Sequence, residues 1–276
     1  MKRKILLIST FIFVFIFWVM WTNLTIATSY FEIENKKIPS DFSGFKIAEV
    51  SDLHNRQWGQ TLIKKIKAEK PDIITITGDL IDSSHTNFDQ AMQFIEEANK
   101  LAPIYYVTGN HEAWIENYAV LEGKLKSAKV MMMDDKSVFI EKEKNKIHIS
   151  GIQDPDFFER ENDYGIQGAR TRTKLTELLE KEFFTIVLSH RPEQFEQYVA
   201  AGANLVLAGH AHGGQVRIPF IGGLVAPNQG FFPKYTEGLH SKKNTKMVVS
   251  RGLGNSIIPI RINNTPELVI ITLKTK

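Results

Sequence analysis

Five short segments of this chain carry side chains that can bind a divalent metal ion. Each follows an apolar run and contains aspartate, asparagine or histidine: Ser51-Asp52-Leu53-His54, Gly78-Asp79, Gly109-Asn110-His111-Glu112, Ser189-His190 and Gly209-His210-Ala211-His212. Carboxylate oxygens and neutral imidazole nitrogens are common ligands of divalent metals. The chain contains no cysteine, so a metal held here must have oxygen and nitrogen ligands.

The apolar runs before these segments have the pattern of strands. They span 45–50, 72–77, 104–107, 184–188 and 205–208. Helical apolar spacing follows the first two runs, at Leu62, Ile63 and Ile66 and then over 88–98. Strands that alternate with helices predict an α/β sheet, and such sheets place binding sites at the carboxyl ends of their strands. We therefore expect the five segments to meet at one place.

The rest of the chain after the first motifs is less regular. Residues 130–133, 138–141 and 147–152 have the composition of short strands and predict a meander, whereas 154–170 lacks periodicity and predicts a loop. A helix is expected around 174–181, and further strands are expected at 216–219, 247–250 and 268–273. The polar stretch 29–43 is expected to lead into the first strand without forming one. These features predict one catalytic domain, residues 29–276.

The N-terminal 28 residues predict a membrane anchor. Ile5 to Trp21 are apolar apart from Ser9 and Thr10, and a spanning helix needs about 20 mostly apolar residues. A cleaved signal peptide is the alternative, but Ala27-Thr28-Ser29 is a poor cleavage site. The basic residues before the span favour a cytoplasmic N-terminus. We therefore expect a single-pass protein of the cell membrane with an extracytoplasmic catalytic domain.

The charge of the chain argues against a nucleic-acid partner. The formal net charge is +3, and Lys2, Arg3 and Lys4 account for all of it. The remaining body is neutral overall, so it lacks the excess of basic residues that nucleic-acid binding requires.

The ligand-type residues are too numerous for one ion, and they fit two ions that share a bridging carboxylate. Their order, D-x-H, G-D-x-x-D, G-N-H-E, an isolated histidine and G-H-x-H, resembles the calcineurin-like metallophosphoesterases from Asp52 to His212. This resemblance implies a two-sheet β-sandwich flanked by helices, an α/β fold in four layers. The anchor and the C-terminal half resemble the small membrane-associated bacterial branch, through Gly213-Gly214-Gln215, Ala226-Pro227-Asn228-Gln229-Gly230 and Arg251-Gly252-Leu253-Gly254.

The resemblance also implies roles for single residues. Asp52, His54 and His212 would hold one divalent ion, Asn110, His190 and His210 the other, and Asp79 would bridge them. The ions would be manganese, iron or zinc, with manganese favoured, and would activate a hydroxide. His111 would protonate the leaving oxygen, and Asp82 would orient and charge His111.

The sequence does not identify the substrate. The expected reaction is hydrolysis of a phosphodiester or pyrophosphate bond, with a lipid-linked phosphoester among the expected substrates. A phosphomonoesterase or nucleotidase on the same centre, a silent binding scaffold and a metal-binding membrane sensor are the alternatives. The family's protein Ser/Thr phosphatases have an arginine where this chain has Ser83. The apolar stretches 219–227 and 231–233 either form a loop that faces the membrane or pack into the sheet.

Overall fold

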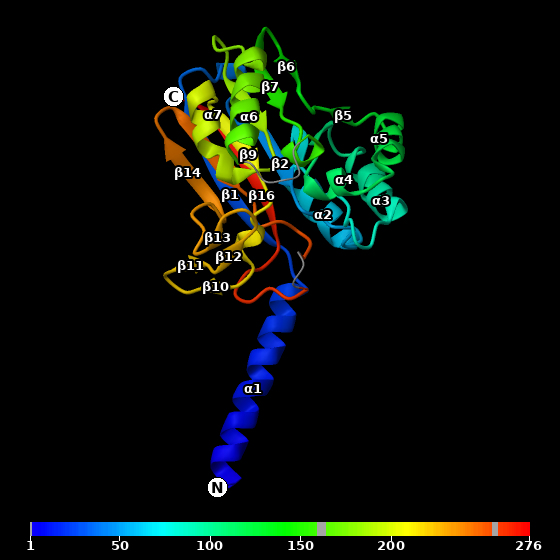
Figure 1. The fold of residues 1–276 in the computed structure, drawn as a ribbon, viewed down its shortest axis with the longest axis vertical. Helices are drawn as coiled ribbons and strands as arrows, with labels where there is room; N and C mark the ends of the chain where they lie inside the picture. The colour runs from blue at the N-terminus through cyan, green and yellow to red at the C-terminus, as the bar shows by residue number, and fades with distance from the viewer. Residues whose placement is uncertain (1, 159–163, 256–258) are drawn as a thin grey trace.

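The computed structural model describes residues 2–158, 164–255 and 259–276. Its first element, α1 (Lys2–Asn23), projects away from the rest of the chain (Figure 1). The helix has a mean hydropathy of 2.4 over its most apolar window, and none of that window is buried in the domain. By length and composition α1 can therefore cross a membrane, although a signal sequence would meet the same criteria.

Two six-stranded sheets form the body of the domain. The first has the order β1 (Ala27–Asn35), β16 (Glu267–Thr275), β2 (Lys46–Val50), β3 (Ile73–Thr77), β4 (Ile104–Val107) and β5 (Met131–Met132). The second has the order β14 (Gly238–Lys242), β15 (Thr245–Val249), β9 (Leu205–Ala208), β8 (Thr185–Leu188), β7 (Asn145–Gly151) and β6 (Lys136–Lys142). The strands β2 to β5 run parallel, as do β7, β8, β9 and β15.

Helices cover the outer face of each sheet, so the domain has four layers. One apolar core lies between the first sheet and α2 (Gln60–Glu69), α3 (Phe88–Ala98) and α5 (Tyr118–Ser127). A second lies between the sheets, and a third lies between the second sheet, α6 (Tyr164–Leu178) and α7 (Phe195–Ala201). The central strands are buried on both faces, as parallel strands between layers must be. The predicted α/β fold, two sheets flanked by helices, is confirmed.

Three local predictions were wrong. Residues 29–35, part of the stretch 29–43 that was expected to be a polar lead-in, belong to β1, in which Ile33 is buried while Tyr30, Glu32 and Glu34 are exposed, the pattern of an edge strand. Residues 131–132 pair with β4 in the first sheet, so the expected meander does not form. The expected loop 154–170 contains the short 3₁₀ helix Pro155–Phe157 and the beginning of α6, and its residues 159–163 lie outside the described part of the chain.

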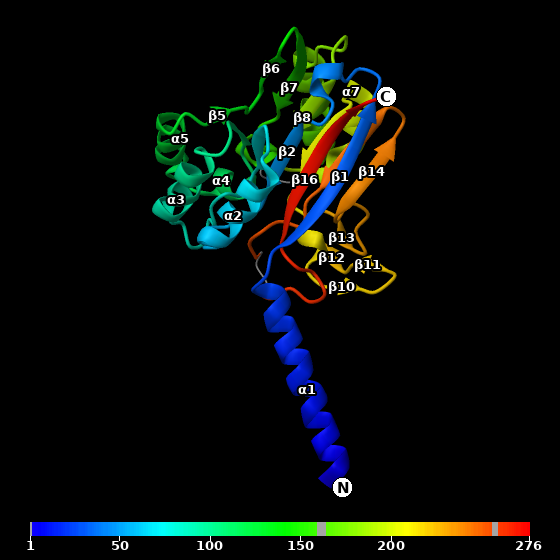
Figure 2. The ribbon, with the colours of Figure 1, turned by 180° about the vertical axis from the view of Figure 1, so that it is seen from behind.

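Small elements surround the carboxyl ends of the central strands. They are α4 (Asn110–Trp114), the 3₁₀ helices Pro192–Gln194 and His212–Gly214, and the hairpins β10 (Arg217–Ile218) with β11 (Gly222–Gly223) and β12 (Val225–Ala226) with β13 (Gly230–Phe231). The 3₁₀ helix Ser40–Phe42 lies at the opposite end of the sheets, just before β2. Both ribbon views place β10 to β13 at the end of the domain from which α1 leaves (Figures 1 and 2). Phe220, Ile221, Phe231 and Phe232 are exposed there. The alternative in which these large side chains pack into the sheet is therefore wrong.

Candidate metal centre

The ligand-type residues of all five motifs lie at the carboxyl ends of central strands from both sheets. Asp52, Asp79, His190 and His210 each stand two residues beyond the last residue of β2, β3, β8 and β9, and Asn110 follows β4. The two sheets face each other across a shared core. Their strand ends therefore meet, and the seven predicted ligand side chains are buried together.

An unusual backbone conformation directs several of these side chains. The residues with positive φ include Asp52, His54, Asp79, His210 and His212, with φ values of 49°, 47°, 52°, 66° and 47°. Non-glycine residues rarely adopt this left-handed region, and it persists at functional sites where the surrounding structure enforces it. The backbone is therefore strained at these residues, and this conformation turns their side chains toward a common point.

Four electron-pair donors converge at the first position. His54 Nε2 lies 3.2 Å from His212 Nε2 and 3.6 Å from Asp79 Oδ2, and His212 Nε2 lies 3.4 Å from Asp52 Oδ1. Ligands held about 2.0–2.2 Å from one metal ion lie about 3.0–3.6 Å from one another. These separations are therefore those of a metal-binding group.

A second group of donors shares Asp79 with the first. His190 Nε2 lies 3.0 Å from Asn110 Oδ1, 3.1 Å from His210 Nδ1 and 3.2 Å from Asp79 Oδ2. His190 Nδ1 lies 2.7 Å from the carbonyl oxygen of Thr77. A carbonyl can only accept, so Nδ1 carries a proton, and in the neutral ring the lone pair of Nε2 would face the other three atoms. A cation is the partner that would satisfy four lone pairs at one point.

The electrostatics of the site also fit a bound cation. Burial lowers the pKa of His54 to about 3 and lowers the pKa of His210 and His212 well below the usual value. These imidazoles are therefore neutral, as ligands must be. Burial also acts to lower the pKa of His190, but the Asp79 carboxylate outweighs it and raises that pKa to about 10. The carboxylates of this site therefore favour positive charge beside them.

Two neighbours of the ligands hold the motif loops in place. The buried carboxylate of Glu112 accepts hydrogen bonds from the backbone N–H groups of Asp79, at 2.9 Å, Gly109, at 2.7 Å, and Ile81, at 3.2 Å. It therefore ties the loop after β3 to the loop after β4. A Cβ on Gly109 would lie 2.2 Å from Asp79 Oδ1, so only glycine leaves room for the Asp79 carboxylate.

His111 lies at the edge of the first group. Its ring is perpendicular to that of His54, with centroids 4.4 Å apart, and its Nδ1 accepts from the backbone N–H of Ser83 at 3.0 Å. The Ser83 hydroxyl lies 3.1 Å from the same nitrogen. Asp82 has an oxygen within 4.8 Å of His111 and His54 nitrogens, while its Oδ1 accepts from the N–H groups of Ser84 and His85. Ser83, which the sequence analysis left without a role, is thus the direct partner of His111.

Two buried arginines, which the sequence analysis also missed, lie next to two of the predicted ligand histidines. Arg191 binds Asp154 through two hydrogen bonds of 2.6 and 2.8 Å, and its Nη1 lies 3.2 Å from His210 Nε2. Arg261 donates to the carbonyls of Gly254 and Arg251, and its Nη2 lies 3.3 Å from His212 Nδ1. A sequence signal for Arg191 existed, because it directly follows the motif residue His190.

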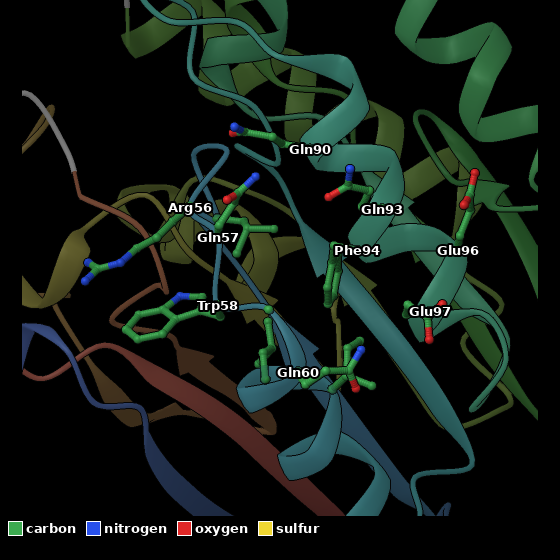
Figure 3. A pocket seen from close by; sticks show the side chains of 13 residues that line it. Arg56, Gln57, Trp58, Gln60, Gln90, Gln93, Phe94, Glu96 and Glu97 are labelled. Carbon is green, nitrogen blue, oxygen red and sulfur yellow. The ribbon is translucent and has the colours of Figure 1, made fainter.

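A cavity of about 340 Å³ lies next to the loop that follows β2 (Figure 3). Its lining comes from the loop after β2, from α2 and from α3, and includes Leu53, Trp58 and Phe94 together with Gln57, Gln60, Gln90 and Gln93. The Arg56 guanidinium stacks on Trp58, with its carbon 4.3 Å from the ring centroid. The lining also includes Glu96 and Glu97 but none of the seven predicted ligands, so we assign the metal chemistry to the strand ends.

Comparison with known proteins decides the family. The model of the calcineurin-like phosphoesterases matches residues 45–214, a stretch that contains all five motifs. This chain is a calcineurin-like phosphoesterase. The metallophosphoesterase YkuE of Bacillus subtilis is 30% identical to it over 263 residues, which cover 91% of this chain and 86% of YkuE.

Two further relatives bear on the activity and the location of this phosphoesterase. The phosphodiesterase YaeI of Escherichia coli is 28% identical over 238 residues, which cover 83% of this chain and 82% of YaeI. A zebrafish (Danio rerio) transmembrane protein with a metallophosphoesterase domain is 26% identical over 254 residues, which cover 88% of this chain and 56% of that protein. The chain is therefore a hydrolase of phosphoric ester bonds, and its ligand groups are those of a divalent-metal enzyme.

Proposed function

We propose that this phosphoesterase hydrolyses phosphodiester or pyrophosphate bonds at a membrane with two divalent metal ions. Asp52, His54 and His212 would hold one ion, and Asn110, His190 and His210 would hold the other, with Asp79 shared between them. The observation that carries the proposal is the convergence of two donor groups on one aspartate. The mixture of carboxylate, amide and imidazole donors suits manganese, iron or zinc, and manganese is favoured.

When bound, two such ions lower the pKa of water and neutralise phosphate charge. The chain's own residues supply the rest of the chemistry. His111 would donate a proton to the departing oxygen, because it borders the first group and its Nδ1 is held by Ser83. The Ser83 hydroxyl can accept as well as donate, so it can stay bonded when Nδ1 becomes protonated. The nearby Asp82 carboxylate would help to orient the His111 ring.

Metal removal tests the reaction. Chelation of the purified chain should abolish turnover of chromogenic phosphodiesters, and Mn²⁺ should restore at least part of it. Full activity of metal-free protein would refute the two-metal proposal. Parallel assays with a monoester and a diester of the same chromophore decide between phosphodiesterase and phosphomonoesterase, and a higher kcat/KM for the monoester would make the enzyme a phosphomonoesterase or nucleotidase.

We also propose that residues 1–28 anchor the catalytic domain, residues 29–276, to the outer side of the cell membrane. Lys2, Arg3 and Lys4 precede the apolar helix and would stay in the cytoplasm. Protease added to intact spheroplasts should then digest the domain. Protection in spheroplasts, followed by digestion after lysis, would reverse the orientation.

A short chain of contacts supports a substrate that is itself in the membrane. Asn23, at the end of α1, exchanges hydrogen bonds of 2.7 and 3.0 Å with the backbone of Arg261. The side chain of Arg261 reaches His212. One residue thus separates the anchor from a proposed metal ligand. A phosphoester linked to a lipid would reach the centre without leaving the bilayer surface. Faster turnover of such a substrate than of its water-soluble headgroup would support this assignment, and equal turnover would contradict it.

A further inference from the structure

Large apolar side chains are exposed on the loops beside the end of α1. Phe220 is fully exposed, Phe231 and Phe232 are 76% and 62% exposed, and Ile221 and Ile260 are 64% and 50% exposed. Phe220 and Ile221 form the turn between β10 and β11, and Phe231 and Phe232 lie in and after β13. Exposed apolar patches that are rimmed by polar residues mark contact surfaces.

Hydrogen bonds hold these loops at a fixed position relative to α1. Asn23 is bonded to the backbone of Arg261, as described above. The segment around Arg261 runs beside β10, because Arg217 N–H donates to the carbonyl of Ile262 at 3.0 Å and Gln215 Nε2 donates to that of Ile260 at 2.8 Å. The exposed side chains therefore belong to a unit that begins at the end of α1, and both ribbon views place this unit on that side of the domain (Figures 1 and 2).

Two of these exposed residues also have an unfavourable backbone conformation. Phe220 and Phe232 have φ values of 68° and 52°, a region where glycine or asparagine is the usual residue and a bulky side chain is an outlier. An aromatic residue at such a turn therefore raises the free energy of the folded state in two ways. Its backbone is strained, and its ring is exposed to water. An apolar environment around these rings would remove the second cost.

The charge of the unit fits a lipid surface. No residue from 217 to 234 is acidic, and the exposed Lys234 follows the apolar side chains. The segment 259–266 also lacks an acidic residue. Arg217 is paired with Glu237 and Arg261 is buried, so the positive charge available to a headgroup comes from Lys234. A lysine next to exposed apolar side chains suits the boundary between anionic headgroups and acyl chains.

We propose that Phe220, Ile221, Phe231, Phe232 and Ile260 form a second membrane contact, which inserts into the boundary of the bilayer that α1 spans. A second copy of the chain is a poorer occupant, because a surface at the end of a spanning helix faces headgroups before it faces another protein. The contact would fix the tilt of the domain and keep the metal centre close to the lipid surface. The inference rests on the proposed anchor and is independent of hydrolysis.

The absence of cysteine allows a direct test with the full chain. Single cysteines are introduced by Phe220→Cys, Phe231→Cys, Phe13→Cys and Lys144→Cys and labelled with an environment-sensitive fluorophore. Each protein is reconstituted as one chain per nanodisc of phosphatidylcholine and phosphatidylglycerol, with and without nitroxide-labelled lipid. Phe13 lies in the middle of α1 and reports the anchor. Lys144 is exposed in the turn between β6 and β7 and serves as the control in water.

Labels at positions 13, 220 and 231 should lose most of their fluorescence to the nitroxide lipid, and the label at 144 should keep it. The labels at 220 and 231 should respond most to nitroxides about 5–10 Å below the headgroups, the depth of interfacial segments. Quenching at 13 without quenching at 220 and 231 would overturn the membrane contact and leave the anchor intact. Absence of quenching at 13 would refute the anchor itself and, with it, the membrane contact.

Discussion

Removal of the Arg191 guanidinium should destabilise the domain strongly. Its side chain is 2% exposed and faces three carboxylates, Asp154 at 2.6 Å, Asp156 at 3.0 Å and Glu193 at 3.8 Å, whose side chains are 0%, 7% and 12% exposed. Arg191→Met fills a similar volume but leaves these carboxylates without their cation. Breaking a buried pair from one side costs about 3–5 kcal/mol. We expect a loss at the upper end of this range, because one arginine serves three acids.

The carboxylates around Arg191 should make the loss of stability in Arg191→Met depend on pH. Burial already raises the pKa of Asp156 and Glu193, and Arg191 opposes that rise. Without the arginine, the folded-state pKa of these carboxyls rises further above the unfolded value. These carboxyls are then tolerated in the folded state at low pH, where they are protonated, and they destabilise it as the pH increases and they lose their protons. The destabilisation by Arg191→Met should therefore be smaller at about pH 5 than at about pH 8.

A double-mutant cycle measures this coupling. The free energy of unfolding of the metal-loaded full chain in detergent is obtained from denaturant titrations that follow tryptophan fluorescence, for the wild type, Arg191→Met, Asp154→Leu and the double variant. The double variant should recover the part of the loss that comes from Asp154, since an apolar pair can replace a buried ion pair at little cost, while Asp156 and Glu193 still lack their cation. A loss below about 1 kcal/mol that does not change with pH would be the behaviour of a solvated surface pair and would refute the reasoning.

Three further outcomes follow from the site and its surroundings. His111→Ala should keep its metal content but lose about 10²–10⁴-fold in kcat for a substrate with a poor leaving group, and an equal loss with p-nitrophenolate as leaving group would show that His111 is not the acid. Asp79→Asn should lower metal content and activity together, and an unchanged metal content by mass spectrometry would contradict the bridging role. Burial raises the pKa of Asp134 to about 6, so its contribution to stability is lost as the pH rises through 6, and Asp134→Asn should remove up to about 3 kcal/mol of pH dependence from the unfolding free energy. Identical pH profiles of the Asp134→Asn variant and the wild type would refute that pKa.

The parts of the fold that the sequence predicted well are the central strands and the residues after them. Strands β3, β4, β8 and β9 are buried on both faces, so each is a mostly apolar run that is free of charged residues and has a clear end. The polar residue just beyond such an end has no place in the core. It can therefore be recognised as a site residue before the structure is known.

The features that sequence reasoning missed depend on contacts between distant segments. Arg191 directly follows the motif residue His190, but its partner Asp154 lies 37 residues away, so the sequence does not show that this arginine is buried in an ion pair. Arg261 donates hydrogen bonds to the main-chain carbonyls of Gly254 and Arg251. Every residue has such a carbonyl, so the sequence does not show which of them face this arginine. β1 has only a weak alternation, because it is an edge strand whose place is set by pairing with β16.

The pairing of β1 with β16 also sets an order of events during synthesis. Ala27 to Asn35 align with Glu267 to Thr275, and the same β16 pairs on its other side with β2. The first sheet therefore lacks an inner strand until residues 267–275 have left the ribosome. Until then β1 and β2 each present an unpaired edge, which is prone to association with other chains. An anchor that emerges first would hold this unfinished sheet at the membrane and away from other nascent chains. Removal of β16 should therefore produce aggregates rather than a smaller folded domain.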